Sequence, residues 1–146
     1  MEIEIKIDNS CKEPKIIIVT DQITDEINAL LKKLADESPP ILTGFRNNQL
    51  EVLEQSEILR IYAESGKVLA ATADGKYTLR QRLYELEARL EQQQFIRISN
   101  SEIINLKKAK KFDLSYTGTI RVMLADSSVS YVSRRYVSKI KKVLGV

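Results

Sequence analysis

The chain lacks the residues on which most catalytic and metal sites depend. Its 146 residues include no histidine, no tryptophan, one cysteine and only five glycines. Histidine is the usual general base near neutral pH and a common metal ligand, and phosphate-binding loops need closely spaced glycines. The carboxylates are scattered, and no spacing pairs them into an acid and a base. We therefore expect no enzyme activity, no catalytic residues, no metal site and no cofactor.

The chain also lacks a long apolar run, and its first residues do not resemble a signal peptide. No stretch approaches the roughly 20 apolar residues that cross a bilayer. The first eight residues alternate charge with isoleucine, whereas a signal peptide places an apolar stretch after a basic one. The lone Cys11 lies in a polar, loop-like segment and has no cysteine with which to form an internal disulfide. These features predict a cytoplasmic globular protein, and its 43% hydrophobic content is enough for one sizeable core.

Charge is polarised along the sequence. Residues 95–146 carry 11 Lys or Arg against 3 Asp or Glu, a net charge of +8. Residues 1–94 carry 12 basic and 17 acidic residues, a net charge of −5. Such an excess of positive charge in one part is typical of a surface that faces a polyanion such as nucleic acid. The acidic part indicates a different partner or contact with solvent.

Residues 1–38 predict a small strand-strand-helix unit. Isoleucines alternate with charged residues over 3–7, and a polar turn leads into an apolar run at 15–20, which together indicate an antiparallel hairpin. Apolar residues at helical spacing then predict a helix over 21–35. Its expected start and stop signals are Thr20 or Asp21, and Pro39 and Pro40.

Residues 39–146 predict a mainly β domain of the α+β class, with mostly antiparallel short strands. Turn pairs such as Asn47-Asn48, Ser65-Gly66 and Asp74-Gly75 separate the first strands. A helix is expected over 82–91, with a Glu85 to Arg89 ion pair on its surface. The expected strands are residues 41–46, 49–54, 58–65, 67–73, 76–80, 95–98, 104–115, 118–125 and 128–133.

The last predicted helix, 134–144, has one cationic side and one apolar side. Helical spacing places Arg135, Lys139 and Lys142 together and puts Val137, Ile140 and Leu144 opposite them. A basic helix face is often only solvated. Here it is accompanied by a second basic cluster, formed by Lys107, Lys108, Lys110 and Lys111.

Asn100 stands between two serines, ahead of a strand-like run, and it has two interpretations. Asparagine and arginine can form paired hydrogen bonds with purine edges in the major groove, which favours a role in reading DNA sequence. Asparagine is also a good helix N-cap, so a structural role for Asn100 is equally consistent with the sequence.

Several of these residues form a pattern that resembles the LytTR family of bacterial DNA-binding domains. The resemblance rests on Phe95, Arg97, Ser101 and Asn105, and on the later run 133–140. It extends from about residue 41 to the C-terminus, so residues 1–38 lie outside it.

The resemblance implies an elongated, mostly antiparallel β domain whose loops enter successive major grooves of double-stranded DNA. It implies that the chain is a transcriptional regulator. Carried over by position, it makes Asn100, Arg135 and Lys67 the expected base contacts. Charge and position add further expected phosphate contacts, namely Arg97, Lys107, Lys108, Arg134 and Lys139.

The chain departs from the family pattern in two ways. Position 99, often histidine in the family, is serine, which changes the bases that are read but not the fold. Family members commonly follow a phosphorylated receiver domain, and 38 residues are too few to form one. Residues 1–38 are instead expected to complete the fold, to form a homodimer, or to bind a regulatory membrane protein. The alternative function is an interaction or antagonist protein that keeps the fold without binding DNA.

Overall fold

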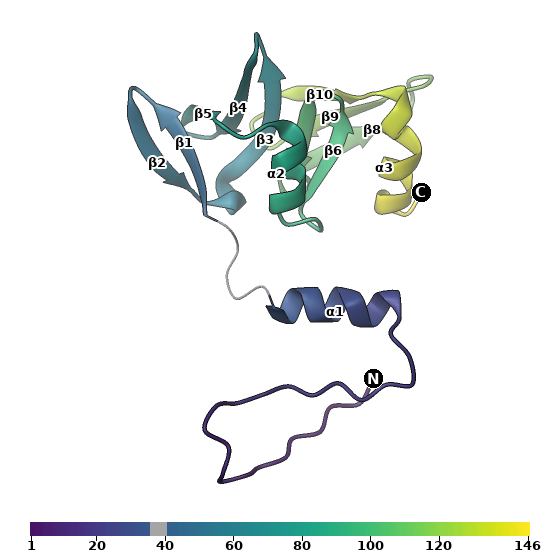
Figure 1. The fold of residues 1–146 in the computed structure, drawn as a ribbon. Coiled ribbons are helices and arrows are strands. Elements are labelled where there is room, and N and C mark those ends of the chain that lie inside the picture. The colour runs from purple at the N-terminus through teal and green to yellow at the C-terminus, as the bar shows by residue number, and fades with distance from the viewer. Residues whose placement is uncertain (36–40) are drawn as a thin grey trace. The chain divides into compact units, whose positions relative to one another are not determined.

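The computed structural model of the protein describes residues 1–35 and 41–146. The packing of the chain divides it into two compact units, Met1–Ser38 and Pro39–Val146. Figure 1 shows one helix with extended chain in the first unit, and the sheets and remaining helices in the second. The expected stop signal of the first helix, Pro39 and Pro40, lies outside the described residues.

The N-terminal unit contains the helix α1 (Asp25–Ala35), which begins later than predicted. The Thr24 hydroxyl accepts a hydrogen bond from the Ile27 N–H at 3.3 Å, so the cap is Thr24. The hydroxyl of Thr20, one of the two expected caps, instead donates to the Gln22 carbonyl at 2.9 Å. A helix begins where a side chain satisfies its free N–H groups, and here Thr24 does so.

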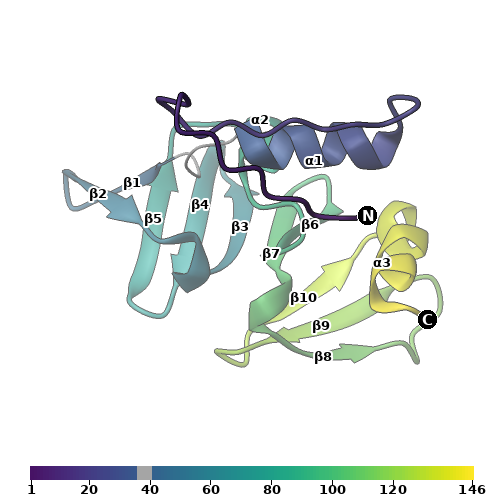
Figure 2. The same cartoon turned by 90° about the horizontal axis from the view of Figure 1, so that it is seen from below.

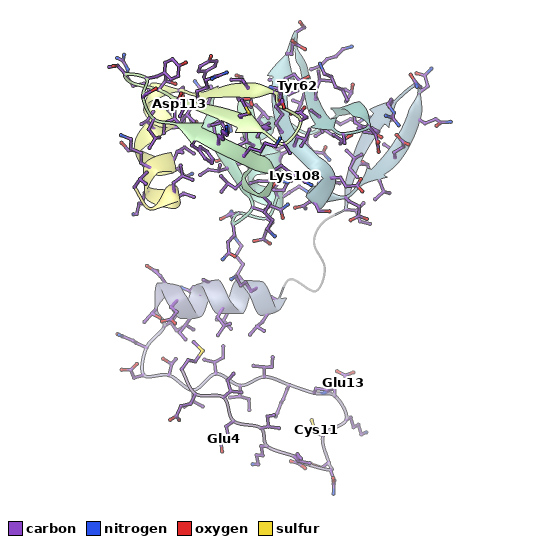
Figure 3. All side chains as sticks on the ribbon, turned by 180° about the vertical axis from the view of Figure 1, so that it is seen from behind. Glu4, Cys11, Glu13, Tyr62, Lys108 and Asp113 are labelled. Carbon is purple, nitrogen blue, oxygen red and sulfur yellow. The ribbon has the colours of Figure 1, made fainter. Side chains whose placement is uncertain are left out.

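The predicted N-terminal hairpin is wrong as a strand pair. Its turn is present, because the Cys11 N–H donates to the Asp8 carbonyl at 3.1 Å, and Figure 3 shows Cys11 where the two extended segments join. No strand is assigned within residues 1–24. Ile3 is 92% exposed and Val19 is 93% exposed. A two-stranded hairpin is marginal unless its apolar face packs on something, and residues 1–35 contain no buried side chain.

The C-terminal unit contains a seven-stranded antiparallel sheet with the order β2-β1-β5-β4-β3-β7-β6. Tight turns connect neighbouring strands of this sheet. Asn47 and Asn48 have φ angles of 52° and 62°, and Ser65 and Gly66 have φ angles of 51° and 76°. Two consecutive positive φ angles suit the right-handed twist of a hairpin, and glycine adopts them without strain. The strands are β1 (Leu42–Arg46), β2 (Gln49–Leu53), β3 (Ile58–Glu64), β4 (Lys67–Thr72), β5 (Gly75–Leu79), β6 (Phe95–Ser99) and β7 (Glu102–Asn105).

The helix α2 (Leu83–Arg89) covers one face of this sheet, as its apolar spacing predicts. Leu83, Leu86 and the following Leu90 are buried in the first core, with side chains from β1, β3, β5, β6 and β7. The predicted surface pair of Glu85 and Arg89 is not formed. Glu85 accepts the Arg82 N–H at 3.4 Å, and Arg89 donates to the Ile41 carbonyl at 3.2 Å.

A second sheet, of order β10-β9-β8, packs with the last helix around a second core. Figure 2 shows β6 and β7 between this sheet and the strands β1–β5. Its elements are β8 (Ala109–Asp113), β9 (Ile120–Leu124), β10 (Val129–Val132) and α3 (Val137–Leu144). The predicted apolar side of α3 is confirmed, because Ile140 is fully buried and Val137 and Leu144 pack beside it.

Strands β6 and β7 belong to both cores. Phe95 and Ile103 face the first core, whereas Ile96, Ile98 and Ile104 face the second. A strand covered on both faces carries apolar residues on both, as Phe95 and Ile96 of β6 do. This arrangement fixes the turn between β6 and β7 on a strand pair that is packed from both sides.

The predicted class, mainly antiparallel β with a few short helices, is confirmed. The predicted single strand over 104–115 is interrupted by a 3₁₀ helix, η2 (Leu106–Lys108). The fully buried Asn105 starts that helix, since its side chain accepts the Lys107 N–H at 3.0 Å and donates to the Ile58 carbonyl at 2.8 Å. The other 3₁₀ helices are η1 (Gln55–Glu57) and η3 (Arg134–Tyr136). Among residues 1–35 and 41–146, no helix is both long and apolar enough to cross a membrane.

Candidate nucleic-acid interface

Two hairpin turns lie at the same end of the seven-stranded sheet. Strand β3 ends where the Ser65-Gly66 turn leads to Lys67, and β7 begins just after the turn at Asn100 and Ser101. The two strands are paired, with Tyr62 opposite Glu102, and the Ala63 N–H donates to the Ser101 carbonyl at 2.8 Å. Residues far apart in sequence are therefore neighbours at one edge of the domain.

The 3₁₀ helix η3 lies at the same end of the sheet and is held there by hydrogen bonds. The Ser133 N–H, just ahead of η3, donates to the Ile98 carbonyl in β6 at 2.9 Å. The Tyr136 hydroxyl donates to the Asn100 side-chain oxygen at 3.4 Å. We call Ser65–Lys67, Asn100–Ser101 and Arg134–Tyr136 the loop cluster. It brings together the three residues expected to contact bases, Lys67, Asn100 and Arg135, and all three are exposed.

Asn100 is not a helix N-cap, so that interpretation of the sequence is wrong. The residues after it form β7, and Asn100 lies at the tip of a two-stranded hairpin. The Ser101 N–H donates to the Ser99 hydroxyl at 3.2 Å, which helps to close the turn. The Asn100 side chain is exposed, and its oxygen accepts the Tyr136 hydroxyl.

Arg97 stabilises this turn through bonds to its backbone. Its guanidinium donates to the Ser99 carbonyl at 2.7 Å and to the Asn100 carbonyl at 2.6 Å, and it pairs with Glu87 of α2 at 2.8 Å. Only 13% of the Arg97 side chain is exposed. These bonds favour a structural role for Arg97, and its expected phosphate contact stays a prediction.

Arg134 and Arg135 extend the loop cluster with exposed positive charge. The Arg135 guanidinium lies 5.8 Å from the centre of the Tyr136 ring. Arg134 packs against Gly118, which has a φ of 75°, and a Cβ there would meet the Arg134 Nε at 3.2 Å. Lys139 follows on the first turn of α3 and is exposed. The domain thus presents three cations on one short segment.

Lys107 and Lys108 lie elsewhere. They belong to η2, at the opposite end of β7 from Asn100, and a strand of this length spans about 10 to 13 Å. Lys108 is half-buried and lines a surface hollow with Asp74 and Asp126. Figure 3 labels Lys108 and, on β3, Tyr62. The structure separates these two lysines from the loop cluster.

Sequence reasoning missed a polar network beneath the loop cluster. Glu102, the first residue of β7, pairs with Arg60 of β3 at 3.2 Å and also accepts the Ser130 hydroxyl of β10. The Arg60 guanidinium stacks on Tyr62, 4.1 Å from its ring centre. The network ties the two sheets together directly below the Asn100 turn. Strand alternation could have placed Arg60 and Tyr62 on one face, but only the fold shows that Ser130 joins them.

Comparison with known proteins agrees with this architecture. The family model described as the LytTr DNA-binding domain matches residues 48–145. A protein of Staphylococcus aureus strain NCTC 8325 / PS 47 is 32% identical over 147 residues, covering 100% of this chain and 99% of the relative. A protein of strain MRSA252 is 31% identical over the same length. Both are named as HTH-type transcriptional regulators.

A solved structure shares the fold. The LytTr DNA-binding domain of a Bacillus cereus protein superimposes with a TM-score of 0.70 at 23% identity, covering 73% of this chain and 97% of that one. The names of the staphylococcal relatives refer to a helix-turn-helix. Within residues 1–35 and 41–146 of this chain, no α-helix directly follows another, because α2 leads into β6 and α3 ends the fold. The loop cluster is built from two hairpin turns and the 3₁₀ helix η3.

Proposed function

The chain belongs to the LytTR family of DNA-binding domains, and we propose that it is a bacterial transcriptional regulator that reads double-stranded DNA with its loop cluster. In this proposal the β6–β7 turn and η3 enter one major groove, and the β3–β4 turn enters the next. One observation carries it: Lys67, Asn100 and Arg135 come from three separate segments and are exposed at one end of the domain. Binding to chromosomal DNA would take place in the cytoplasm.

The chemistry of the loop cluster suits base recognition. An asparagine amide can form paired hydrogen bonds with adenine, and an arginine guanidinium can do so with guanine. The main-chain carbonyl of Asn100 is held by Arg97 and its side chain is contacted by Tyr136, so the amide is oriented before DNA arrives. A group that is already ordered loses less entropy on binding. Each such base contact contributes roughly 1 to 3 kcal/mol of discrimination.

Phosphate contacts would provide much of the affinity. Arg134 and Lys139 flank Arg135 and are exposed, so we propose them as the main phosphate contacts. Phosphate contacts fix the position of a protein on the duplex and make its affinity depend on salt. Arg97 is bonded internally, so we do not propose it as a main phosphate contact. Lys107 and Lys108 lie outside the loop cluster, and the proposal does not need them.

The proposal is tested by selecting bound duplexes from a random pool with the wild-type chain, Asn100→Ala, Arg135→Ala and Lys110→Ala. Lys110 is an exposed residue of β8 outside the loop cluster, so it controls for the loss of one positive charge. We expect a defined consensus for the wild type and for the control. Asn100→Ala and Arg135→Ala should each lose preference at separate positions, by roughly 5- to 150-fold per position. An unchanged consensus in both variants would refute the base contacts.

The competing function is an interaction or antagonist protein that keeps this fold without binding DNA. A mobility shift with the DNA upstream of its own operon, at near-physiological salt, separates the two functions. A regulator shifts this DNA, and competition with excess unrelated duplex does not remove the shift. An antagonist gives no shift. Repeated half-sites in the selected consensus would further support binding as a homodimer, because site symmetry mirrors protein symmetry.

A further inference from the structure

The apolar side chains of the N-terminal unit are largely exposed to solvent. Five β-branched side chains, which we call the N-terminal apolar patch, are 71% to 93% exposed: Ile3, Ile5, Ile7, Ile17 and Val19. No described residue between 1 and 35 is buried. Several large apolar side chains left exposed in one unit often mark a contact with another molecule.

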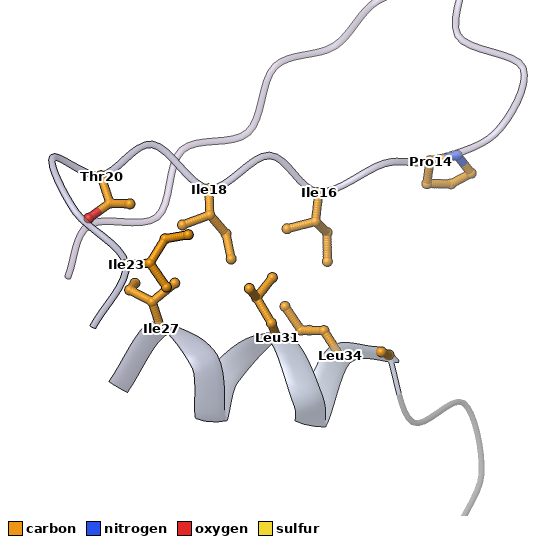
Figure 4. Close-up of a pocket in the computed structure, with 9 residues that line it drawn as sticks. Pro14, Ile16, Ile18, Thr20, Ile23, Ile27, Leu31 and Leu34 are labelled. Atoms are coloured by element: carbon orange, nitrogen blue, oxygen red, sulfur yellow. The ribbon is translucent and has the colours of Figure 1, made fainter. Parts of the chain in front are cut away.

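The helix α1 does not provide this cover. Its apolar side chains Ile27, Leu31 and Leu34 face Ile16 and Ile18 across a groove within the same unit, as Figure 4 shows. Successive side chains of an extended segment point in opposite directions. Ile17 and Val19 therefore point away from α1, which leaves them free for a contact outside the unit.

The backbone of the same segments is also without partners. Among the described residues, no ladder of hydrogen bonds joins residues 2–7 to residues 15–19, although both run extended. An extended segment with free N–H and C=O groups is ready to pair with another chain. Both its side chains and its backbone thus indicate that a partner adds to this unit.

We propose that the partner is a second copy of this chain, docked through the N-terminal apolar patch. Burying one aliphatic side chain removes about 60 to 120 Å² from water, so five remove about 300 to 600 Å² per copy. A stable interface buries about 800 Å² per partner, of which about 450 to 520 Å² is apolar. The patch therefore matches what a dimer of this kind requires.

Charge complementarity favours a second copy and suggests the register. In an antiparallel pairing centred on Ile5, Ile3 of one copy faces Ile7 of the other, and Glu4 faces Lys6. Opposite charges directly across a strand pair are stabilising. The like-charged Glu2 and Asp8 face each other only at the ends, where solvent screens them. A two-fold axis through Ile5 makes the contact self-complementary, as homodimer interfaces are.

The role of the dimer, which is to link two DNA-binding domains, rests on the proposed function. Linked domains bind repeated sites more tightly because the second binding event becomes intramolecular. The contact itself is independent of DNA, so it can be tested without any duplex.

Light scattering of the full chain at about 50 µM, a concentration that populates a micromolar dimer, tests the contact. We expect twice the 16.7 kDa mass of one chain for the wild type and the single-chain mass for Ile5→Glu/Ile17→Glu. Val52→Glu is the matched control, because Val52 is a β-branched residue of β2 and is 68% exposed. It should remain dimeric. A monomeric wild type, a dimeric double variant or a monomeric control would each overturn the proposal.

Crosslinking supplies a second measurement that needs no disruptive substitution. In a Cys11→Ser background, Ile5→Cys places one thiol on the proposed two-fold axis, where Cα atoms about 4.5 to 5.5 Å apart permit a disulfide. We expect a covalent dimer on mild oxidation. Ile27→Cys, which faces the groove beside α1, should give none. Equal crosslinking of both variants would overturn the register. DNA binding to a single site is a separate measurement, and it tests the proposed function alone.

Discussion

The two units of this chain use similar sequence patterns with opposite results. Isoleucine alternates with polar residues around Ile5 in the N-terminal unit and around Ile98 in β6. Ile98 is fully buried in a strand, whereas Ile5 is 84% exposed in a segment without strand pairing. Alternation thus favours extended backbone, but a stable strand also needs a neighbouring strand and a surface to cover.

The turns of the two units differ in the same way. Asp8 accepts hydrogen bonds from the Ser10 N–H and hydroxyl at 2.9 and 2.6 Å, and both residues are exposed. The Asn100 turn is instead fixed by Arg97, whose side chain is largely buried. A turn anchored to a packed domain can hold a recognition side chain in place. A turn held only by its own residues remains free to adapt to a partner.

The largest predicted difference is in the free energy of unfolding. Ile98→Ala should lower it by about 2 to 5 kcal/mol, because it leaves a cavity in the second core. Ile5→Ala should change it by less than about 0.5 kcal/mol at concentrations where the chain is monomeric, because its side chain is already solvated. Urea unfolding of both variants measures this contrast. Equal losses would show that the N-terminal unit folds together with the domain.

A second prediction concerns Arg97 as the anchor of the Asn100 turn. Arg97→Gln removes the bonds to the Ser99 and Asn100 carbonyls, so it should cost about 1 to 3 kcal/mol of stability and weaken discrimination at the base read by Asn100. Glu87→Gln is the matched control. It removes the charge of a partner that is 43% exposed but leaves the two carbonyl bonds in place. Urea unfolding and binding selection measure the two effects. A stable variant with wild-type preference would contradict the anchoring role.

Much of the fold could be predicted because its signals are local. The Asn47-Asn48 and Ser65-Gly66 turns indicate hairpins. The leucine spacing of α2 and the apolar stripe of α3 indicate which helix faces are buried. The N-terminal hairpin was mispredicted because pairing depends on what covers a strand, and no local pattern encodes that. Nor does any local pattern indicate that Asn105 interrupts a strand-like run to bond with Ile58.

The candidate site shows the same limit. The positions of Asn100, Arg135 and Lys67 follow from the motif, and only the fold shows that they share one end of the domain. Net charge alone did not distinguish Arg97, which is bonded internally, from Arg134, which is exposed. Burial and hydrogen bonding decide whether a cation can reach a phosphate, and both depend on residues distant in sequence.

The third prediction uses salt to separate the two basic regions of the domain. Arg134→Ala and Lys139→Ala should each reduce the slope of log affinity against log salt by about 1, because each removes one proposed phosphate contact. Lys107→Ala should leave the slope unchanged, since Lys107 lies at the far end of β7. Fluorescence anisotropy over a salt series measures the slopes. A change for Lys107→Ala as large as the others would place DNA along the whole strand.

The smallest predicted effect compares two turns of the same chemistry, one in each unit. Asp126 accepts the Ser128 hydroxyl at 2.5 Å and its N–H at 2.9 Å, much as Asp8 does with Ser10. The hydroxyl bond is the main cause that lowers the pKa of each carboxyl below its ordinary value of 3.8. A carboxyl with a lowered folded-state pKa stabilises the fold above its unfolded-state pKa. That stabilisation is lost as pH falls through the folded-state pKa.

This linkage should appear only where the turn belongs to a cooperative fold. Asp126 joins β9 to β10, so Asp126→Asn should lower the free energy of unfolding at pH 7, and its deficit relative to wild type should shrink as pH falls below 3.8. Asp8→Asn should match wild type at every pH, because residues 1–35 contain no buried side chain whose exposure on unfolding would couple to Asp8. Urea titrations between pH 7 and about pH 3, spanning the usual carboxyl pKa, measure both. If Asp8→Asn showed the same pH-dependent deficit, the two units would unfold as one.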